Sequence, residues 1–173
     1  DDLDYALTHP TDLRIFAIAQ ALEQGYTVER ISELTKIDPW FLERLNNIVC
    51  FAQTLKGYAS VTDIDKEVMA EAKRLGFSDF QIARLVENPE GSMEADVLRV
   101  RDHRKSLGVT PKVRRINTVA SEYPDLTNYL YVTYGADTNS IPYDMNSGNN
   151  IIVLGSGAYR IGSSVEFDWC SVN

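Results

Sequence analysis

The clearest candidate for chemistry in this sequence is a glycine-rich turn near the C-terminus, at Gly155-Ser156-Gly157 with a further glycine at Gly162. The turn follows the apolar run 151–154, a pattern that predicts a buried strand, a tight turn and the start of a helix. Such a turn can present backbone amides to an anion at a helix N-terminus. The dinucleotide fingerprint requires G-x-G-x-x-G, however, and four residues separate the last two glycines here. The P-loop lysine is also missing, so neither standard phosphate-binding motif is present.

Other residue types that commonly catalyse reactions are scattered along the chain. His9 and His103 have no serine or cysteine partner in a recognisable pattern, and we expect both at the surface. Glu166 and Asp168 are two positions apart, so on a helix they would point to different sides and are not an acid/base pair by spacing alone. No spacing of His, Cys or carboxylates resembles a metal site. We therefore expect no catalytic, cofactor-binding or metal-binding residues in this chain.

The elements before residue 108 are predicted to be helices. The first runs from Thr11 and ends at Gly25, since glycine commonly follows the last turn of a helix. Its core side is predicted from apolar residues at helical spacing, namely Ile15, Ile18, Ala19 and Leu22. Further helices are expected over residues 27–34, 38–57, 63–75 and 92–107, with a short one after Ser78.

Two helix starts carry strong capping signals. Asp38 is followed by proline, which is favoured at the first helical position. Ser78 and Gln81 have the spacing of a capping box. We expect Trp40 and Phe41, in the first turn of the 38–57 helix, to pack into the core.

Two stretches echo each other: ALEQGYTVERISEL at 21–34 and AKRLGFSDFQIARL at 72–85. Each reads as a helix, a glycine stop, an aromatic residue, a hydroxyl cap and a short helix. An ancient duplication would produce this echo, and so would two corners that obey the same capping rules. Either origin predicts two helical corners in one small domain.

After Gly108 the pattern changes. Residues 109–117 are extended and basic, and the aromatic and β-branched residues at 129–134 predict a strand or extended ribbon. Residues 135–150 read as a surface loop. The α/β unit that begins at residue 151 lacks the partner strand that a parallel crossover needs, so we expect the chain to be a piece of a longer protein.

The composition excludes several classes of protein. The chain has 173 residues, of which 44% are hydrophobic, and a formal net charge of −8, so nucleic acid and anionic membranes are poor partners. No apolar run is long enough to span a membrane, and the acidic start is unlike a signal peptide. Cys50 and Cys170 lie in segments assigned to different domains, so we expect no disulfide framework and a reducing compartment.

One basic stretch interrupts this acidic chain and leaves two interpretations open. It is either a solvated surface that pairs with nearby acids or a docking patch for other parts of a parent protein. Its cations are Arg99, Arg101, Arg104, Lys105, Lys112, Arg114 and Arg115. Residues 28–55 also have the outline of a helix-turn-helix, but the second helix opens on apolar and acidic residues where a DNA reader would be basic.

Four stretches together resemble the large subunit of carbamoyl-phosphate synthetase, especially the eukaryotic, multifunctional pyrimidine-pathway type; the arginine and urea-cycle types stay open. They read LTKIDPWFL (34–42), AKRLGFSDFQIA (72–83), NTVASEYPDLTNYLYVTY (117–134) and LGSGAYRIGSSVEFDWC (154–170). In order and spacing they cover nearly the whole chain.

The resemblance implies a mainly α fold. Residues 1–108 resemble the helical oligomerisation (connection) domain that joins the two ATP-grasp synthetase halves. Residues 109–173 resemble a linker and the truncated start of the Rossmann-like α/β (pre-ATP-grasp) subdomain of the second, carbamate-phosphorylating half. The family makes carbamoyl phosphate from bicarbonate, ammonia taken from glutamine, and two ATP. Its ATP, Mg²⁺ or Mn²⁺, and K⁺ bind in modules outside this stretch.

The same resemblance suggests residues of the family's internal tunnel. Ser164 and Glu166 fall at positions that line the carbamate passage in the family, and Arg160 and Gly162 belong to the same turn. Ser164 stands where many members have glycine, which leaves its role open. A carboxylate at position 166 could accept hydrogen bonds from ammonia or from the carbamate amino group.

We therefore expect a non-catalytic scaffold and oligomerisation segment of carbamoyl-phosphate synthetase that is inactive alone. Its expected partners are the two ATP-grasp halves of its parent, a glutaminase domain or subunit, and a second copy, with no nucleic acid and no membrane. The expected compartment is the cytoplasm, with mitochondria open for a urea-cycle type. The alternatives are a nucleotide-binding fragment, through residues 155–162, and a helix-turn-helix nucleic-acid-binding module.

Overall fold

A computed structural model of the chain describes residues 2–86, 92–117, 120, 122–124 and 129–141. The strand predicted at 151–154, the glycine turn after it and Cys170 lie outside these residues. The chain divides into two compact units, Asp1–Ser140 and Ile141–Asn173. All described helices and strands belong to the first unit.

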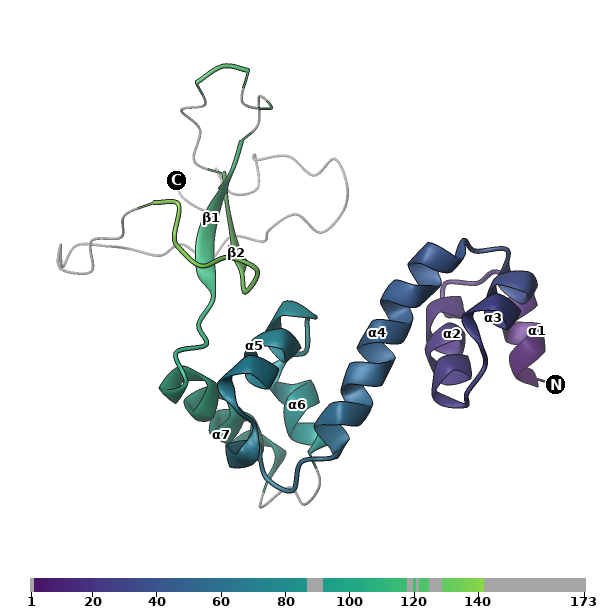
Figure 1. Ribbon diagram of the computed structural model, residues 1–173, viewed down its shortest axis with the longest axis horizontal. Helices are drawn as coiled ribbons and strands as arrows, with labels where there is room; N and C mark the ends of the chain where they lie inside the picture. The colour runs from purple at the N-terminus through teal and green to yellow at the C-terminus, as the bar shows by residue number, and fades with distance from the viewer. Residues whose placement is uncertain (1, 87–91, 118–119, 121, 125–128, 142–173) are drawn as a thin grey trace, which may run out of the picture. The chain divides into compact units, whose positions relative to one another are not determined.

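The described residues are mostly helical, with one small sheet (Figure 1), so the predicted mainly α class is confirmed. The helices are α1 (Asp2–Thr8), α2 (Arg14–Glu23), α3 (Val28–Thr35), α4 (Pro39–Lys56), the 3-10 helix η1 (Val61–Asp63), α5 (Lys66–Arg74), α6 (Asp79–Leu85) and α7 (Met93–Ser106). The strands are β1 (Lys112–Ile116) and β2 (Tyr129–Thr133).

The predicted caps are confirmed. The Asp38 carboxylate accepts a hydrogen bond of 2.8 Å from the amide of Trp40 at the start of α4. At the start of α6, the Ser78 hydroxyl accepts from the Gln81 amide while the Gln81 side chain accepts from the Ser78 amide. Each cap satisfies amides that the first helical turn leaves without intrahelical partners.

Glycine ends three of the helices in the left-handed conformation, with φ of 85° at Gly25, 96° at Gly76 and 75° at Gly108. After α2, the amide of Tyr26 donates to the carbonyl of Ala21 over 2.9 Å. Such bonds define the Schellman motif, which requires a left-handed residue that glycine adopts at little cost.

Two clusters of buried side chains hold the helices together. The N-terminal core joins α1, α2, α3 and the first part of α4, and it consists of Leu7, Ile18, Ala21, Leu22, Ile31 and Leu42. The second core joins the end of α4 to η1 and to α5–α7, and it includes Leu55, Ile64, Met69, Ile82, Val100 and Val109. The buried residues of α4 are therefore divided between the two cores, Leu42 in the first and Leu55 in the second.

Strands β1 and β2 pair antiparallel, with Val113 opposite Val132 and Arg115 opposite Leu130. The strand predicted at 129–134 and the extended stretch at 109–117 are thus confirmed, and together they make a two-stranded sheet. Tyr134, directly after β2, packs against the second core. This contact gives support that an isolated pair of strands lacks.

Two details of the helix prediction were wrong. Helix α1 was not predicted, although Leu3, Ala6 and Leu7 have helical spacing and Leu7 is fully buried. In α2 the buried residues are Ile18, Ala21 and Leu22, whereas Ile15 is 51% exposed. Helix α2 has apolar residues on several sides, so periodicity alone could not select the side that faces the core.

Candidate functional site

The residues suggested for the tunnel, Arg160, Gly162, Ser164 and Glu166, all lie outside the described residues. Their roles stay a prediction. Within the described residues, the two features that could serve a function are a groove on the N-terminal core and a polar network on the second core.

The groove lies between α1 and α2 and has a volume of about 420 Å³. Its floor is apolar and half-buried, formed by Leu3 and Ala6 of α1 and Ala17 of α2. Leu13 and Phe16 stand beside it and are 63% and 68% exposed. Large exposed apolar side chains around a hollow commonly mark a surface that binds another protein.

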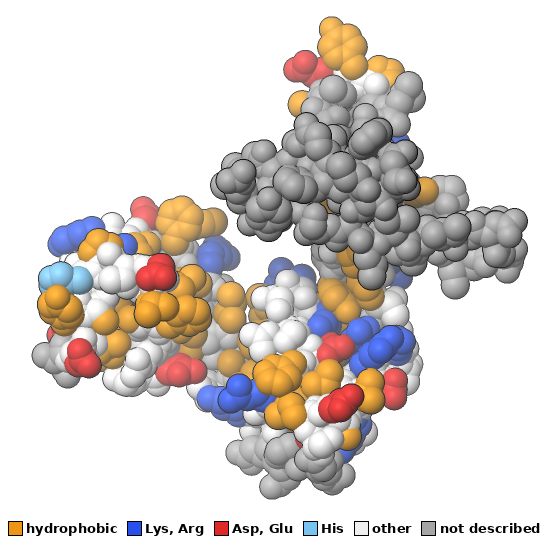
Figure 2. Space-filling model, turned by 180° about the vertical axis from the view of Figure 1, so that it is seen from behind, with side chains coloured by type: hydrophobic (Ala, Val, Ile, Leu, Met, Phe, Trp, Pro, Cys, Tyr) orange, Lys and Arg blue, Asp and Glu red, His pale blue; other side chains and the backbone are white. Residues whose placement is uncertain are grey.

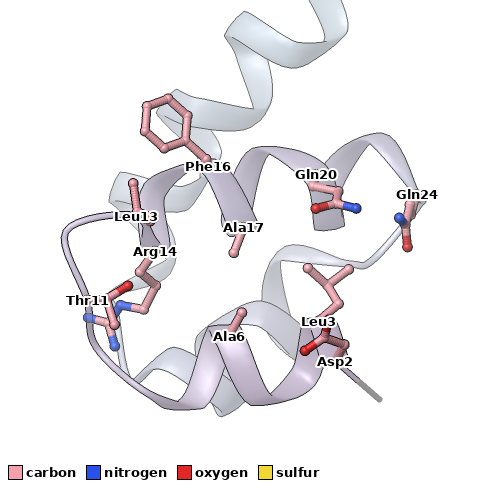
Figure 3. A pocket seen from close by; sticks show the side chains of 10 residues that line it. All are labelled: Asp2, Leu3, Ala6, Thr11, Leu13, Arg14, Phe16, Ala17, Gln20 and Gln24. Carbon is pink, nitrogen blue, oxygen red and sulfur yellow. The ribbon is translucent and has the colours of Figure 1, made fainter.

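The two ends of the groove differ in charge (Figure 3). Asp2 lies at the end where α1 begins, and Arg14 lies at the opposite end, where α2 begins. They are the two charged residues among those that line the groove. Sequence reasoning missed the groove because α1 was not predicted.

The first turn of α4 adds further apolar surface. Trp40 and Phe41 are 55% and 59% exposed, so the prediction that they pack into the core was wrong. Their rings meet edge to face, with centroids 4.9 Å apart, and the Arg44 guanidinium lies over the Trp40 ring. The core position in this turn is taken by Leu42 instead. Figure 2 shows hydrophobic side chains gathered on one face of the N-terminal helices.

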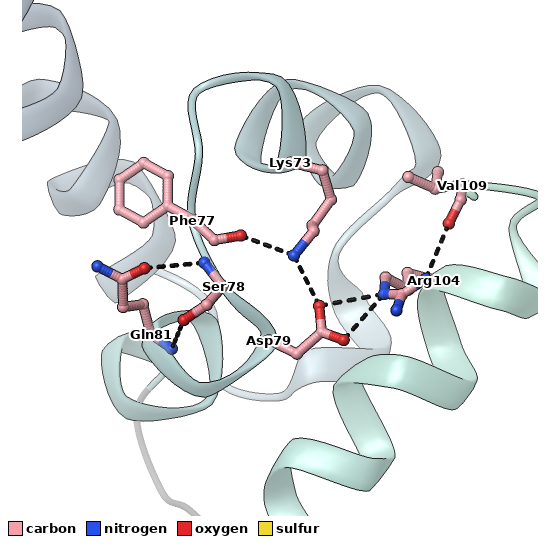
Figure 4. Close-up of polar contacts among 7 residues, drawn as sticks. All are labelled: Lys73, Phe77, Ser78, Asp79, Gln81, Arg104 and Val109. Atoms are coloured by element: carbon pink, nitrogen blue, oxygen red, sulfur yellow. Dashed lines mark hydrogen bonds and ion pairs between the residues drawn. The ribbon is translucent and has the colours of Figure 1, made fainter. Parts of the chain in front are cut away.

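The polar network connects three elements of the second core (Figure 4). The Asp79 carboxylate accepts hydrogen bonds from the Lys73 ammonium at 2.8 Å and from Nε of Arg104 at 3.0 and 3.1 Å. Lys73 also donates to the Phe77 carbonyl over 2.7 Å. The network thus joins α5, the start of α6 and the end of α7.

Electrostatics favour the ionised form of the Asp79 carboxylate. Burial by itself raises the pKa of Asp79, but the hydrogen bonds and charges of Lys73 and Arg104 outweigh it and hold that pKa below its ordinary value. Both cations also lie over the Tyr134 ring, at 5.0 and 5.7 Å from its centroid. Burial raises the pKa of Tyr134. The network therefore helps to attach the end of β2 to the helices.

The two histidines differ from each other. His9 is exposed and stacks on Tyr5, as predicted for a surface residue. His103 is half-buried and its Nε2 lies 2.7 Å from the Ile64 carbonyl, so placing it on the surface was wrong. A carbonyl can only accept, so this contact requires a proton on Nε2. The role of His103 is to join α7 to the segment after η1.

The basic stretch between residues 99 and 115 supplies internal contacts. Arg99 pairs with Asp96, and Arg104 with Asp79. Arg114 donates to the carbonyl of Thr138. These contacts fit the interpretation of cations that pair within their own domain.

Metal-binding and membrane-spanning features are not found in the part of the chain that the structure describes. No three His, Cys, Asp or Glu side chains gather there as metal ligands would. None of the described helices combines the length and hydrophobicity needed to cross a bilayer.

Comparison with known families places the chain. The family model described as carbamoyl-phosphate synthetase large chain, oligomerisation domain, matches residues 1–108. This chain belongs to that family. The model of the carbamoyl phosphate synthase preATP-grasp domain matches residues 147–173. The predicted carbamoyl-phosphate synthetase resemblance is confirmed.

Relatives of two types match nearly the whole chain. Multifunctional protein URA2 of Saccharomyces cerevisiae is 46% identical over 172 residues, 99% of this chain and 7% of the relative. The carbamoyl phosphate synthase arginine-specific large chain of Eremothecium gossypii is 51% identical over 99% of this chain and 15% of its own length. The corresponding mitochondrial chain of Schizosaccharomyces pombe is 49% identical, over 99% and 14%. This chain therefore spans 7–15% of the length of these relatives.

Proposed function

We propose that this chain is the scaffold and self-association segment of a longer carbamoyl-phosphate synthetase. Its task would be to hold two ATP-grasp synthetase halves in place and to offer a surface for a second copy. The observation that carries the proposal is the exposed apolar surface of Leu13, Phe16, Trp40 and Phe41 on a domain of the oligomerisation family. A surface of this kind needs a partner to remove it from water.

Sedimentation velocity of the 173-residue chain over micromolar concentrations tests the proposal. We expect a concentration-dependent equilibrium between monomer and a larger species. A chain that stays monomeric, together with a parent enzyme whose assembly is unchanged when residues 1–108 are deleted, would overturn it. Titration calorimetry with MgATP adds a second measurement, because a scaffold segment should give no heat of binding.

We propose that the parent makes carbamoyl phosphate from bicarbonate, ammonia and ATP, with Mg²⁺ or Mn²⁺ and K⁺ as cofactors held outside this chain. Its ammonia would come from a glutaminase domain or subunit. Relatives named both as multifunctional and as arginine-specific match the chain, and some carry a mitochondrial name. We propose the cytoplasm as the compartment, with mitochondria as the alternative.

We also propose a domain boundary at residue 108. In the segment that follows it, we propose a tunnel role for the turn that contains Arg160, Gly162, Ser164 and Glu166. Replacing Glu166 by leucine in the parent should then uncouple glutamine hydrolysis from carbamoyl phosphate output. The ratio of glutamate to carbamoyl phosphate formed measures this coupling. An unchanged ratio would remove Glu166 from the tunnel.

A further inference from the structure

We propose that two copies of this chain pair antiparallel across the α1–α2 groove, so that Asp2 of each copy meets Arg14 of the other. This proposal rests on the proposed self-association and names the surface that performs it. Its partner is a second copy of the same chain.

The distribution of charge supports a second copy as the partner. Asp2 and Arg14 are the charged residues of the groove, and they lie at its two opposite ends (Figure 3). A two-fold axis through the middle of the groove would bring each acidic end to the basic end of the other copy. Pairing about a two-fold axis uses the same patch on both copies, which must therefore complement itself. A groove with one charge of each sign at opposite ends meets that condition.

The charged side chains are available for such pairing. Among the ion pairs of the described residues, none includes Asp2 or Arg14. Asp2 is exposed and Arg14 is half-buried. Charges at the edge of an interface fix its register and orientation more than they add affinity. We therefore infer that Asp2 and Arg14 set the antiparallel orientation of the two copies. The adjacent apolar residues would supply most of the affinity.

The groove surface combines a large exposed aromatic ring with small side chains on its floor. Phe16 lines the groove near its basic end and is 68% exposed, and in Figure 3 its ring points away from Ala17 and Ala6 of the same copy. The floor of the groove contains small residues, Ala6 and Ala17, which leave room for a larger side chain. In the antiparallel arrangement the Phe16 ring of each copy packs over the α1–α2 surface of the other. Buried aromatic side chains of this kind are frequent anchors of protein interfaces.

Charge reversal on the 173-residue chain tests the pairing. Asp2→Arg and Arg14→Asp should each weaken self-association by about tenfold, because each variant brings like charges together twice in its homodimer. An equimolar mixture of the two variants should recover association, since both contacts become attractive in the mixed pair. Sedimentation velocity measures all three samples. Recovery of association on mixing would require a contact between two chains, because mixing does not change a contact within one chain.

Matched controls separate the groove from the rest of the surface. Asp12→Arg reverses an exposed charge outside the groove lining, and should associate as the unchanged chain does. Phe16→Ser should weaken association by about tenfold or more, whereas Phe80→Ser, on the exposed surface of the second core, should not. Thermal unfolding followed by circular dichroism confirms that each variant is folded.

The outcomes distinguish the two proposals. If the chain associates but the reversed variants associate equally well, or if mixing restores nothing, the groove pairing is wrong while the self-association function stands. If the chain is monomeric at all concentrations, the groove pairing is wrong, and the deletion of residues 1–108 from the parent then decides whether the self-association function is wrong as well.

Discussion

The α2–α3 corner and the α5–α6 corner have the same backbone structure but different side-chain interactions. In the first, the Tyr26 amide donates to the Ala21 carbonyl over 2.9 Å, and in the second the Phe77 amide donates to the Ala72 carbonyl over 3.0 Å. Both alanines are fully buried, and so are the isoleucines ten positions later, Ile31 and Ile82. The two stretches are therefore similar in their backbone hydrogen bonds and in their buried residues as well as in sequence.

Two of the equivalent positions at which the corners differ change the contacts that each corner makes. The first corner has Leu22 and Val28, which pack in the N-terminal core. The second has Lys73 and Asp79, which form an ion pair that also includes Arg104. The glycine and the cap set the path of the backbone, while the residues around them decide what the corner holds. The first corner supports an apolar core, and the second attaches α7 and the end of β2.

A third glycine motif helps to interpret the resemblance of the corners. The Val109 amide donates to the Arg104 carbonyl after α7, in the same pattern around Gly108. No helix follows this motif, because the chain continues into β1. The shared glycine stop therefore does not require a duplication, since the ordinary way to end a helix produces it.

The largest effect is expected when the second corner loses the charge of Asp79, on which its polar contacts depend. Asp79→Asn should lower the free energy of unfolding by about 3 kcal/mol, because it leaves Lys73 and Arg104 facing each other without a carboxylate. Urea unfolding at pH 7 measures the change. Asp102→Asn, an exposed carboxylate on α7, is the matched control and should change stability by less than about 0.5 kcal/mol. Equal losses in the two variants would contradict the role of the network.

The pH dependence of the free energy of unfolding tests the same interaction, because the direction of the Asp79 pKa shift predicts how the stability changes with acid. The pKa of Asp79 is lower in the folded chain than its ordinary value of about 3.9. The carboxylate therefore contributes its full stabilisation above about pH 4, and the contribution is lost as the pH falls through the folded pKa. The gap in stability between the unchanged chain and Asp79→Asn should shrink with acid. A gap that instead grows as the pH falls towards 4 would show that the pKa is raised.

The second test compares how much the stability of each corner depends on a glycine with positive φ. Gly25→Ala and Gly76→Ala should each cost about 1–2 kcal/mol, because both glycines have positive φ and an added Cβ would meet no neighbouring atom within 4 Å. The cost is thus conformational and should be similar in both corners. Asparagine tolerates this conformation better, so Gly76→Asn should lose less than Gly76→Ala. Urea unfolding of the three variants would reveal unequal corners.

The third test compares the two caps. Thr27→Ala and Ser78→Ala each remove a side-chain acceptor for an amide in the first turn, of Arg30 and Gln81 respectively. Each should lower stability by about 1 kcal/mol. Replacement by glycine should lower stability by only roughly a few tenths of a kcal/mol, so the glycine variant is the matched control at each position. A large loss with glycine would indicate that the side chain does more than cap.

The smallest effects are expected at the third helical position of each corner. Arg30 forms an exposed ion pair with Asp4 over 2.9 Å, so Arg30→Ala should cost about 0.2–1 kcal/mol and the cost should fall in 1 M salt. Gln81 is neutral and completes the capping box, so the cost of Gln81→Ala should not depend on salt. Denaturation at low and high salt measures both. Salt dependence at position 81 would contradict this difference.

Much of the fold could be predicted because its signals are local. Caps such as Asp38 and Ser78, and stops such as Gly25 and Gly76, act through hydrogen bonds between residues close in sequence. The strand at 129–134 was visible from its residue types. The assignment to carbamoyl-phosphate synthetase came from a resemblance over long motifs, and the tunnel residues depend on that resemblance alone.

What the sequence by itself determined was where helices begin and end, how the corners turn, and which family the chain belongs to. Only the tertiary structure decided that Trp40, Phe41 and Ile15 are exposed, that His103 is half-buried, and that α1 packs beside α2 to form a groove. The physical reason is the range of the interactions. A cap is completed within one turn of helix, whereas burial depends on partners distant in sequence, and periodicity cannot identify them.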